Sequence, residues 1–275
     1  NENTVNIDRV NVTGTNTGGT ADGTGNTLNV KGQNAAQNIG GFQRVNFDAT
    51  GVAAGETMLN LNGSAATKVD WTNLTATGTA EKPLTLLKND SGIDLDGYTG
   101  AAKSETTDTT ETNVDVRKNN DGKVTEITYE GYQFAGVTAP VISGTDVYGG
   151  ISKAGNATHT NHITVNSDYT NVYGGHTSGA GTTKDDRDSS YSNTVTISGG
   201  TSSDDVHGGY TYDGGAATGN KVTLTGGVVN GLVYGGYTNN GGDATGNTVT
   251  LTGGKVTDKV YAGYADGGAA TGNTV

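Results

Sequence analysis

The chain of 275 residues contains no cysteine, only two prolines and only one tryptophan. Without cysteine there is no disulfide framework, the usual support of small extracellular domains, and a chain that crosses an outer membrane unfolded benefits from having none. Two prolines and no Gly-X-Y period exclude collagen. No apolar run approaches the ~20 residues of a transmembrane helix, and no signal peptide is recognisable. The chain begins at Asn1 and stops within a repeat, so we expect it to be a piece of a longer protein.

Apolar residues are also scarce. They make up 31% of the chain, a share too small to fill the wide core of an ordinary globular domain. Glycine is abundant, with 47 residues, and threonine, asparagine and valine are common. Threonine and valine favour strands, whereas glycine and asparagine favour tight turns. The composition therefore predicts many short strands around a thin core.

Positive charge is in the minority, since the formal net charge is −12 and the pI is near 4.6. An acidic surface repels phosphate backbones and anionic lipids. We therefore expect no nucleic-acid partner and no direct binding to anionic membranes. Cations, basic proteins and neutral glycans stay open as partners.

Two short units alternate along the C-terminal half. The first reads Gly-Asn-Lys/Thr-Val-Thr-Leu-Thr-Gly-Gly at residues 219–227 and 246–254, with earlier versions at 161–165 and 193–200. The second reads Val-Tyr-Gly-Gly, and its aromatic position is occupied by Tyr148, Tyr173, His207, Tyr234 and Tyr261. These residues are spaced by 25, 34, 27 and 27 positions. A period near 27 that holds two or three short strands predicts one coil of a β-solenoid.

Alternation within the first unit assigns its side chains to two faces. Val249 and Leu251 share one face, and the threonines beside them share the other. Stacked coils then form two inward columns, one of Val195, Val222 and Val249 and one of Ile197, Leu224 and Leu251. We expect the leading asparagines to form a ladder through their side-chain amides, and the glycine pairs to allow positive φ or close backbone approach.

The pattern divides the chain into three parts: N-terminal solenoid coils at 1–41, a non-repetitive β-rich region at 42–135, and regular solenoid repeats at 136–275. Within the middle part, short strands are expected at 57–61, 84–87 and 124–129, and an exposed loop at 100–112. The predicted fold class is all-β, a parallel β-solenoid or β-helix with coils of about 27 residues and an irregular inserted region.

These units resemble the passenger regions of large Gram-negative autotransporters. The resemblance rests on the Gly-Asn-Thr-Val-Thr-Leu-Thr-Gly-Gly and Val-Tyr-Gly-Gly-Tyr-Thr units and on the blocks at 41–47 and 55–61, and it spans most of the chain. It implies a type V secretion β-helix that is displayed extracellularly at the outer membrane. Membrane anchoring would come only through a translocator domain that this sequence lacks. The resemblance also implies adhesion as the usual role, with biofilm formation and virulence related to it.

Departures from the repeat supply the candidate partner-binding residues. The longest connection, 177–192, lengthens one coil to 34 residues and carries a charged cluster, and loops on one face of a solenoid often bind partners. A row of tyrosines at one repeat position is the second candidate, because tyrosine rings pack on sugars and anchor interfaces. Buried, the same row would only cap the thin core. The candidates are Asp185, Asp186, Arg187, Asp188, Tyr191, Tyr210, Tyr237 and Tyr264.

Catalysis and metal binding have weaker signals. Some β-helices cleave glycans with clustered carboxylates, and Asp204 and Asp205 precede His207. Solvated turns explain such residues equally well, and no other catalytic motif occurs. The four histidines lack the spacing of a zinc site, whereas structural calcium at the aspartate-containing turns stays open. We expect no catalytic residue, no bound cofactor and no metal ligand.

The sequence thus predicts an adhesin passenger fragment without catalysis. Its partner would be a host receptor or glycan, or another copy of the chain. A glycan-active β-helix enzyme and a passive stalk are the alternatives. A groove of clustered carboxylates would favour the enzyme, and a smooth ladder surface would favour adhesion.

Overall fold

The computed structural model describes the chain except for residues 1, 20–23, 54, 144, 154–155 and 179–188. Throughout the described part the regular structure is strand, and it includes no helix of the length and hydropathy that a membrane span requires. The chain divides into two compact units. Unit 1 comprises Asn1–Thr106 and Thr112–Gly131, and unit 2 comprises Thr107–Glu111 and Tyr132–Val275. The predicted fold class, an all-β parallel solenoid with coils of about 27 residues, is confirmed.

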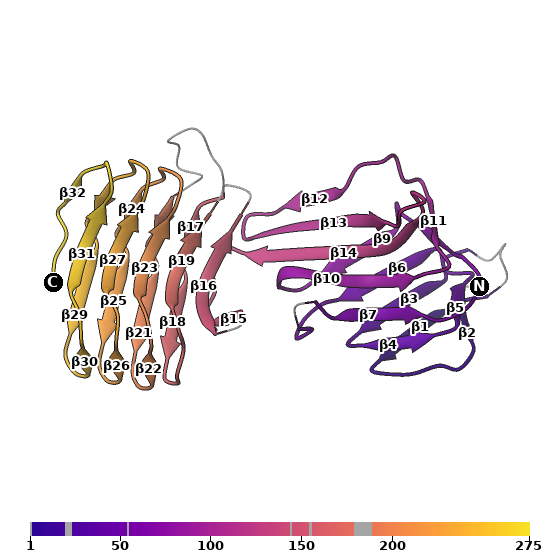
Figure 1. Cartoon of the computed structure of the whole chain (residues 1–275), viewed down its shortest axis with the longest axis horizontal. Helices are drawn as coiled ribbons and strands as arrows, with labels where there is room; N and C mark the ends of the chain where they lie inside the picture. Colours follow the sequence, from indigo (N-terminus) through magenta and orange to yellow (C-terminus); the bar gives the residue numbers. More distant parts are fainter. Residues whose placement is uncertain (1, 20–23, 54, 144, 154–155, 179–188) are drawn as a thin grey trace. The chain divides into compact units, whose positions relative to one another are not determined.

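Unit 1 stacks short parallel strands in several sheets (Figure 1). One sheet contains β1 (Thr4–Asp8), β3 (Thr27–Lys31), β6 (Arg44–Asp48) and β9 (Leu74–Thr77). Two small sheets contain β2 (Thr15–Thr17) with β5 (Asn38–Gly40), and β8 (Thr67–Asp70) with β11 (Ile93–Asp96). The largest contains, in order, β12 (Lys103–Thr106), β13 (Thr110–Lys118), β14 (Val124–Gln133), β10 (Ala80–Asn89), β7 (Thr57–Leu61) and β4 (Asn34–Ala36).

The parallel stacking of unit 1 continues beyond residue 42, because β6 and β9 extend the sheet that β1 and β3 begin. β7, β10 and β14 cover the three strands expected in the middle region, and β14 joins β10 in antiparallel fashion. The expected loop at 100–112 is partly wrong, since β12 and the start of β13 are strands. Their β-branched threonines favour extended backbone, although most of β12 is exposed as predicted. The three-part division of the chain stays a prediction.

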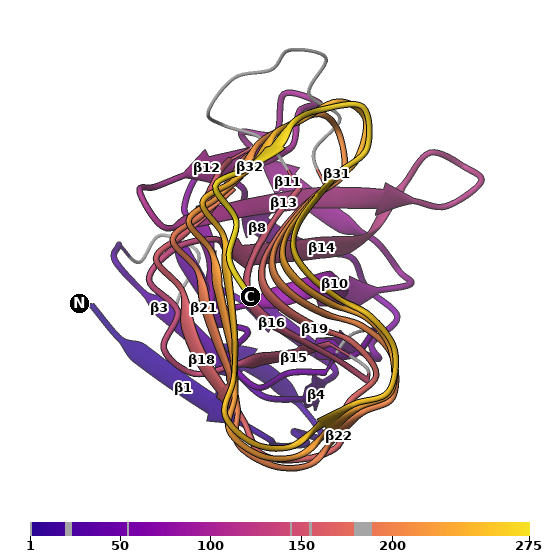
Figure 2. The same cartoon turned by 90° about the vertical axis from the view of Figure 1, so that its left-hand side faces the viewer.

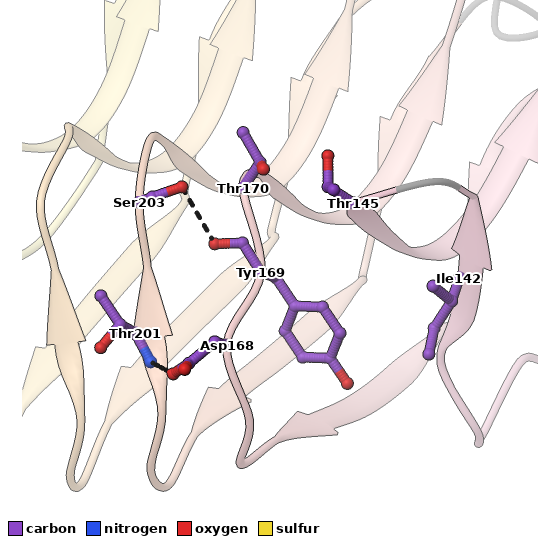
Figure 3. Close-up of a pocket in the computed structure, with 7 residues that line it drawn as sticks. All are labelled: Ile142, Thr145, Asp168, Tyr169, Thr170, Thr201 and Ser203. Carbon is purple, nitrogen blue, oxygen red and sulfur yellow. Dashed lines mark hydrogen bonds between the residues drawn. The ribbon is translucent and has the colours of Figure 1, made fainter.

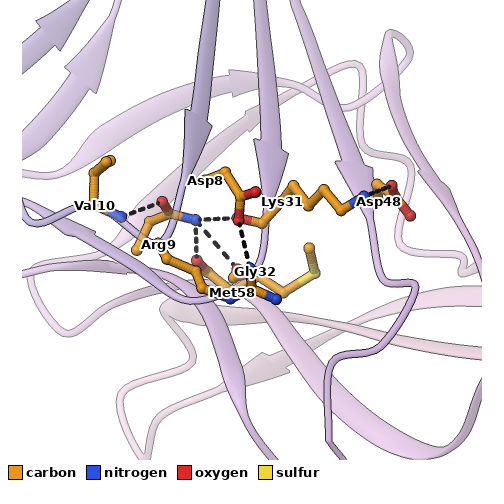
Figure 4. A network of polar contacts seen from close by, with 8 residues as sticks. Asp8, Arg9, Val10, Lys31, Gly32, Asp48 and Met58 are labelled. Atoms are coloured by element: carbon orange, nitrogen blue, oxygen red, sulfur yellow. Dashed lines mark hydrogen bonds and ion pairs between the residues drawn. The ribbon is translucent and has the colours of Figure 1, made fainter.

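A buried asparagine, Asn34, organises the turn after β3 through bonds to Lys31, Gly32 and Met58, which are labelled in Figure 4. The side chain of Asn34 donates to the backbone carbonyls of Lys31, Gly32 and Met58 at 2.8–3.2 Å, and its own oxygen accepts a backbone N–H at 3.0 Å. Buried backbone groups need such partners wherever strands end. Outside the turn, the Lys31 ammonium lies 3.4 Å from the Asp48 carboxylate, an exposed ion pair that adds little stability.

Unit 2 is the regular solenoid, and its coils follow nearly the same path when viewed end-on (Figure 2). The sheet that we call the tyrosine sheet contains β15 (Val141–Ser143), β16 (Asp146–Ser152), β19 (Val172–Thr177), β23 (Val206–Thr211), β27 (Val233–Thr238) and β31 (Val260–Ala265). The opposing sheet contains β18 (His162–Val165), β21 (Thr194–Ile197), β25 (Lys221–Leu224) and β29 (Thr248–Leu251).

Two sheets of two-residue strands complete the coils of unit 2. One contains β17 (Thr158–His159), β20 (Ser190–Tyr191), β24 (Ala217–Thr218), β28 (Ala244–Thr245) and β32 (Ala270–Thr271). The other contains β22 (Thr201–Ser202), β26 (Val228–Val229) and β30 (Lys255–Val256). β15 pairs antiparallel with β16, whereas the repeated coils that follow pair in parallel. Each coil therefore stacks on the previous one with its side chains in register.

The thin core of unit 2 consists of aligned apolar columns. The strand register confirms the alignment of both predicted columns, because it pairs Val195 with Val222 and Val249, and Ile197 with Leu224 and Leu251. The expected burial is wrong for Leu251, which is 44% exposed because β29 has no further strand of its sheet beyond it in the described chain. The valines of β16, β19, β23 and β27 pack against them and are buried, whereas Val260 of β31 is partly buried. A few apolar side chains per coil are enough, because parallel stacking repeats the same contact at every step.

The predicted asparagine ladder is also confirmed. Each side-chain amide donates to the side-chain oxygen of the next asparagine at 2.8–3.1 Å, through Asn161, Asn193, Asn220, Asn247 and Asn273. Glycine pairs of the tyrosine sheet lie directly against this ladder: a Cβ on Gly236 would come within 2.4 Å of Nδ2 of Asn247. These pairs therefore allow close approach, whereas positive φ is found at turn glycines such as Gly227, with φ of 77°.

Candidate functional site

Two rows of aromatic rings cross the tyrosine sheet, and we call them together the aromatic ladder. The first row consists of Tyr148, Tyr173, His207, Tyr234 and Tyr261. Its neighbouring ring centroids lie 4.9–5.4 Å apart, and the ring planes are within 11° of parallel. In the second row they lie 4.8–5.3 Å apart and within 6°, through His176, Tyr210, Tyr237 and Tyr264. Coil stacking at the strand spacing produces these ring stacks directly.

The glycine pair explains why both rows lie on the same face. Residues three apart in a regular strand point to opposite faces, yet the rings of Tyr173 and His176 meet edge to face at 4.9 Å. Strand pairing of β19 skips Gly174 on both sides, and a Cβ on Gly174 or on Gly175 would meet atoms of the coil interior. Because both glycines face the interior, the alternation is interrupted in every coil and the two rings lie on the same side of the sheet.

Stacking decides which parts of the rings a partner could reach. Each ring inside a row has neighbours on both faces, so its edge and polar tip are what stay accessible. Tyr210 and Tyr237 are half-buried and Tyr264 is 39% exposed. The three predicted tyrosines are therefore brought together in one row. Neighbouring rings block the stacking of sugars on Tyr210 and Tyr237, whereas Tyr264 is stacked on one face only. Their role in partner binding stays a prediction.

The aromatic ladder is uncharged at neutral pH. Burial raises the pKa of Tyr173 and of Tyr234, so both hydroxyls stay protonated. Burial lowers the pKa of His176 to about 4 and that of His207 to about 3, so both imidazoles are neutral. A neutral strip therefore crosses a chain whose net charge is −12.

His207 departs from the tyrosine pattern of the first row. Its ring lies between Tyr173 and Tyr234, and the residue is only 4% exposed. Its Nδ1 is buried and has no hydrogen-bond partner within the described part of the chain. A buried polar atom without a partner costs about 1–3 kcal/mol, so this row is less stable than a continuous row of tyrosines would be.

The other predicted partner-binding residues lie elsewhere. Asp185, Asp186, Arg187 and Asp188 fall outside the described residues. Tyr191 belongs to β20, is 36% exposed and stacks on His159 with ring centroids 4.9 Å apart. It therefore forms a separate aromatic pair and is not part of the aromatic ladder.

A groove of about 580 Å³ lies beside β15 in unit 2 (Figure 3). We call it the Tyr169 groove, and it is lined by Ile142, Thr145, Asp168, Tyr169, Thr170, Thr201 and Ser203. Ile142 is 59% exposed, whereas Tyr169 is half-buried and packs partly on the apolar core. The volume of the groove falls within the range of small-molecule sites, ~300–1,000 Å³.

Sequence reasoning missed the Tyr169 groove, although one signal pointed to it. The first repeat unit ends in a glycine pair at 199–200 and 226–227, but the preceding coil reads Ser167-Asp168-Tyr169 at the corresponding place. The same coil is also short, with 25 residues between its aromatic positions. In this coil, which lacks the glycine pair, Tyr169 forms a parallel β-bridge with Ser202 of the next coil.

Unit 1 carries a second concave surface, of about 640 Å³, on the outer face of β1, β3, β6 and β9. Side chains along this face bond to one another at 2.7–2.8 Å, in a row formed by Asn6, Asn29, Asn46 and Thr75. Because the polar groups of these side chains form hydrogen bonds with one another, few of these groups are free to bind a ligand.

Acidic side chains such as Asp146, Asp168 and Asp205 accept hydrogen bonds from backbone N–H groups of the next coil. Oδ1 of Asp205 accepts the Leu232 N–H at 2.7 Å, and burial raises the pKa of this carboxyl. Within the described ranges, no group of three or more histidine, aspartate or glutamate side chains is placed to hold a metal ion.

Comparison of the chain with models of known protein families, with curated proteins and with solved structures found no match. What its own geometry establishes is a parallel β-solenoid with a neutral aromatic ladder on one sheet and a groove beside β15.

Proposed function

We propose that this chain is a fragment of an autotransporter-type passenger that attaches a Gram-negative cell to a host surface or to another cell, without catalysis. The repeat units that resemble such passengers support this proposal, and so does the parallel solenoid into which they fold. Display on the outer surface of the cell is part of the proposal. The observation that carries it is the aromatic ladder, a continuous and neutral row of ring edges across five stacked strands.

The aromatic ladder has the physical properties of an attachment surface. Five strands at ~4.8 Å spacing give it a length of roughly 20 Å. Its rings are already held by their neighbours, so little side-chain entropy is lost when a partner binds. Tyrosine is enriched at protein interfaces because it combines a large apolar ring with a hydroxyl. Carboxylates lie close to the ladder, since Asp146 accepts a hydrogen bond from the Tyr148 hydroxyl at 3.4 Å, so a neutral or basic partner suits this surface better than an acidic one.

Removal of hydroxyls tests the attachment role without removing the rings. Tyr210→Phe, Tyr237→Phe and Tyr264→Phe, combined in one chain, keep the stacking but eliminate the polar tips of the second row. Displayed on cells, the combined variant should attach to host cells or to other displaying cells several-fold less than the parent chain. Thr223→Ser and Thr250→Ser, on the outer face of the opposing sheet, serve as the matched control.

Analytical ultracentrifugation over a wide concentration range separates the two kinds of partner. Reversible association that is weakened in the phenylalanine variant indicates another copy of the chain as the partner. A monomer that still supports attachment indicates a host ligand. Equal attachment by the parent chain and the folded phenylalanine variant would contradict the role of the aromatic ladder.

A further inference from the structure

The Tyr169 groove contains an aromatic ring that no neighbour stacks. Rings inside the two rows of the aromatic ladder are stacked on both faces, whereas no aromatic ring of the described residues stacks on Tyr169. In Figure 3 its ring reaches from its own strand towards the side of the groove where Ile142 lies. A half-buried tyrosine ring and the exposed Ile142 side chain together give the groove an apolar lining of the kind found in ligand pockets.

The ring of Tyr169 is held firmly in place. Its hydroxyl oxygen accepts a hydrogen bond from the Ser167 hydroxyl at 2.7 Å. Its backbone N–H donates to the Thr201 carbonyl at 2.8 Å, and its carbonyl accepts the Ser203 N–H at 2.8 Å. Because Thr201 and Ser203 belong to the next stacked coil, these bonds fix the position of Tyr169 before any ligand binds.

The rim of the groove is polar, and several of its side-chain oxygen atoms form no hydrogen bond with the described residues. Oδ1 of Asp168 accepts the Thr201 N–H at 2.8 Å, while its Oδ2 has no hydrogen-bond partner among the described residues. The hydroxyls of Thr145, Thr170 and Thr201 are likewise without a side-chain hydrogen bond in the described part of the chain. An ionised carboxylate accepts only, and threonine hydroxyls both donate and accept.

We propose that the Tyr169 groove binds one unit of a neutral saccharide, with an apolar sugar face against Tyr169 and Ile142 and sugar hydroxyls donating to Asp168. Sugars combine C–H faces with hydroxyl donors, which matches an aromatic platform beside a carboxylate and hydroxyls. The charge selects against acidic sugars, because Asp168 would face them in a chain of net charge −12. This proposal rests on the attachment function above and names the chemical class of its ligand.

Two exposed positions allow the groove to be tested without unfolding the coil. Ile142→Ser removes the aliphatic wall, and Asp168→Asn removes the charge while keeping the oxygen that receives the Thr201 N–H. The matched control is Tyr212→Ala, which removes a tyrosine that is 48% exposed on another turn of unit 2. Circular dichroism of each variant verifies that the solenoid is retained.

Saturation-transfer NMR with the whole chain measures the binding of neutral mono- and disaccharides, sialylated and uronic-acid sugars, and a lysine-rich peptide. We expect transfer to the C–H protons of a neutral sugar, with affinity reduced about tenfold by Asp168→Asn, comparably by Ile142→Ser, and unchanged by Tyr212→Ala. Transfer to the peptide or to the acidic sugars alone, or equal affinity in all variants, would overturn the proposal.

Cell attachment measured on the same variants separates this inference from the function on which it rests. Attachment that is unchanged by both groove variants, in a chain that binds no neutral sugar, refutes the saccharide site and leaves attachment in place. Sugar binding that depends on Asp168 in a chain that mediates no attachment supports the site and refutes the attachment function.

Discussion

Replacement of Asn220 by alanine would test whether the asparagine ladder holds the solenoid together. The residue is completely buried. Its Nδ2 donates to the Ser190 carbonyl at 2.8 Å and to Oδ1 of Asn247 at 3.1 Å. Its Oδ1 accepts both the backbone N–H and the Nδ2 of Asn193, at 3.1 and 3.0 Å. The side chain therefore joins its own coil to the coils before and after it, and alanine cannot replace these bonds.

The size of the effect follows from the groups that lose a partner. Asn220→Ala removes the acceptor of the Asn193 N–H and a donor to the Ser190 carbonyl. A buried group left without its hydrogen bond costs about 1–3 kcal/mol. We therefore expect the free energy of unfolding to fall by about 2–6 kcal/mol, before any added effect of the cavity.

Urea denaturation, followed by the near-ultraviolet circular dichroism of the tyrosines, measures this change. Asn230→Ala is the matched control, because Asn230 is an exposed residue of the following turn and exposed substitutions usually change stability by less than ~0.5 kcal/mol. A loss of stability in Asn220→Ala no larger than that in the control would refute the reasoning. The ladder would then be a consequence of coil stacking and not one of its causes.

Other positions of unit 2 give further predictions. Gly236→Ala places a Cβ 2.4 Å from Nδ2 of Asn247 and should lower the urea midpoint by an amount equivalent to about 1–3 kcal/mol of overpacking; an unchanged midpoint would contradict close approach as the reason for this glycine. Gly227→Ala, at φ of 77°, should destabilise by about 1–2 kcal/mol; unchanged stability would show that the turn relaxes. His207 has its pKa lowered from 6.5 to about 3 by burial, so the unfolded chain binds more protons between these pH values and stability falls as the pH decreases through them. His207→Tyr should remove up to about 1.4 kcal/mol per pH unit of that slope and raise stability at neutral pH; an unaltered slope would show that His207 is protonated without unfolding.

Much of unit 2 could be predicted from the sequence, because its repeats place equivalent residues at equal spacing. The columns of Val222 and Leu224, the asparagine ladder and the tyrosine row of Tyr237 all follow from a period of 27 residues and strict parallel stacking. The Tyr169 groove could not be predicted in this way. It arises where the repeat is shortened, and it needs Ile142 from the antiparallel strand β15 as its other wall.

The sequence by itself determined the fold class, since alternating valine and threonine in a repeat of short strands leaves a parallel solenoid as the arrangement that buries the apolar face. It did not determine the orientation of the aromatic rows. By simple alternation Tyr173 and His176 belong on opposite faces, and only the interrupted alternation at the glycine pair, which lies against the asparagine ladder, brings them together. The tertiary structure also decided which rings are stacked, because that depends on whether the neighbouring coil supplies another ring or leaves a groove.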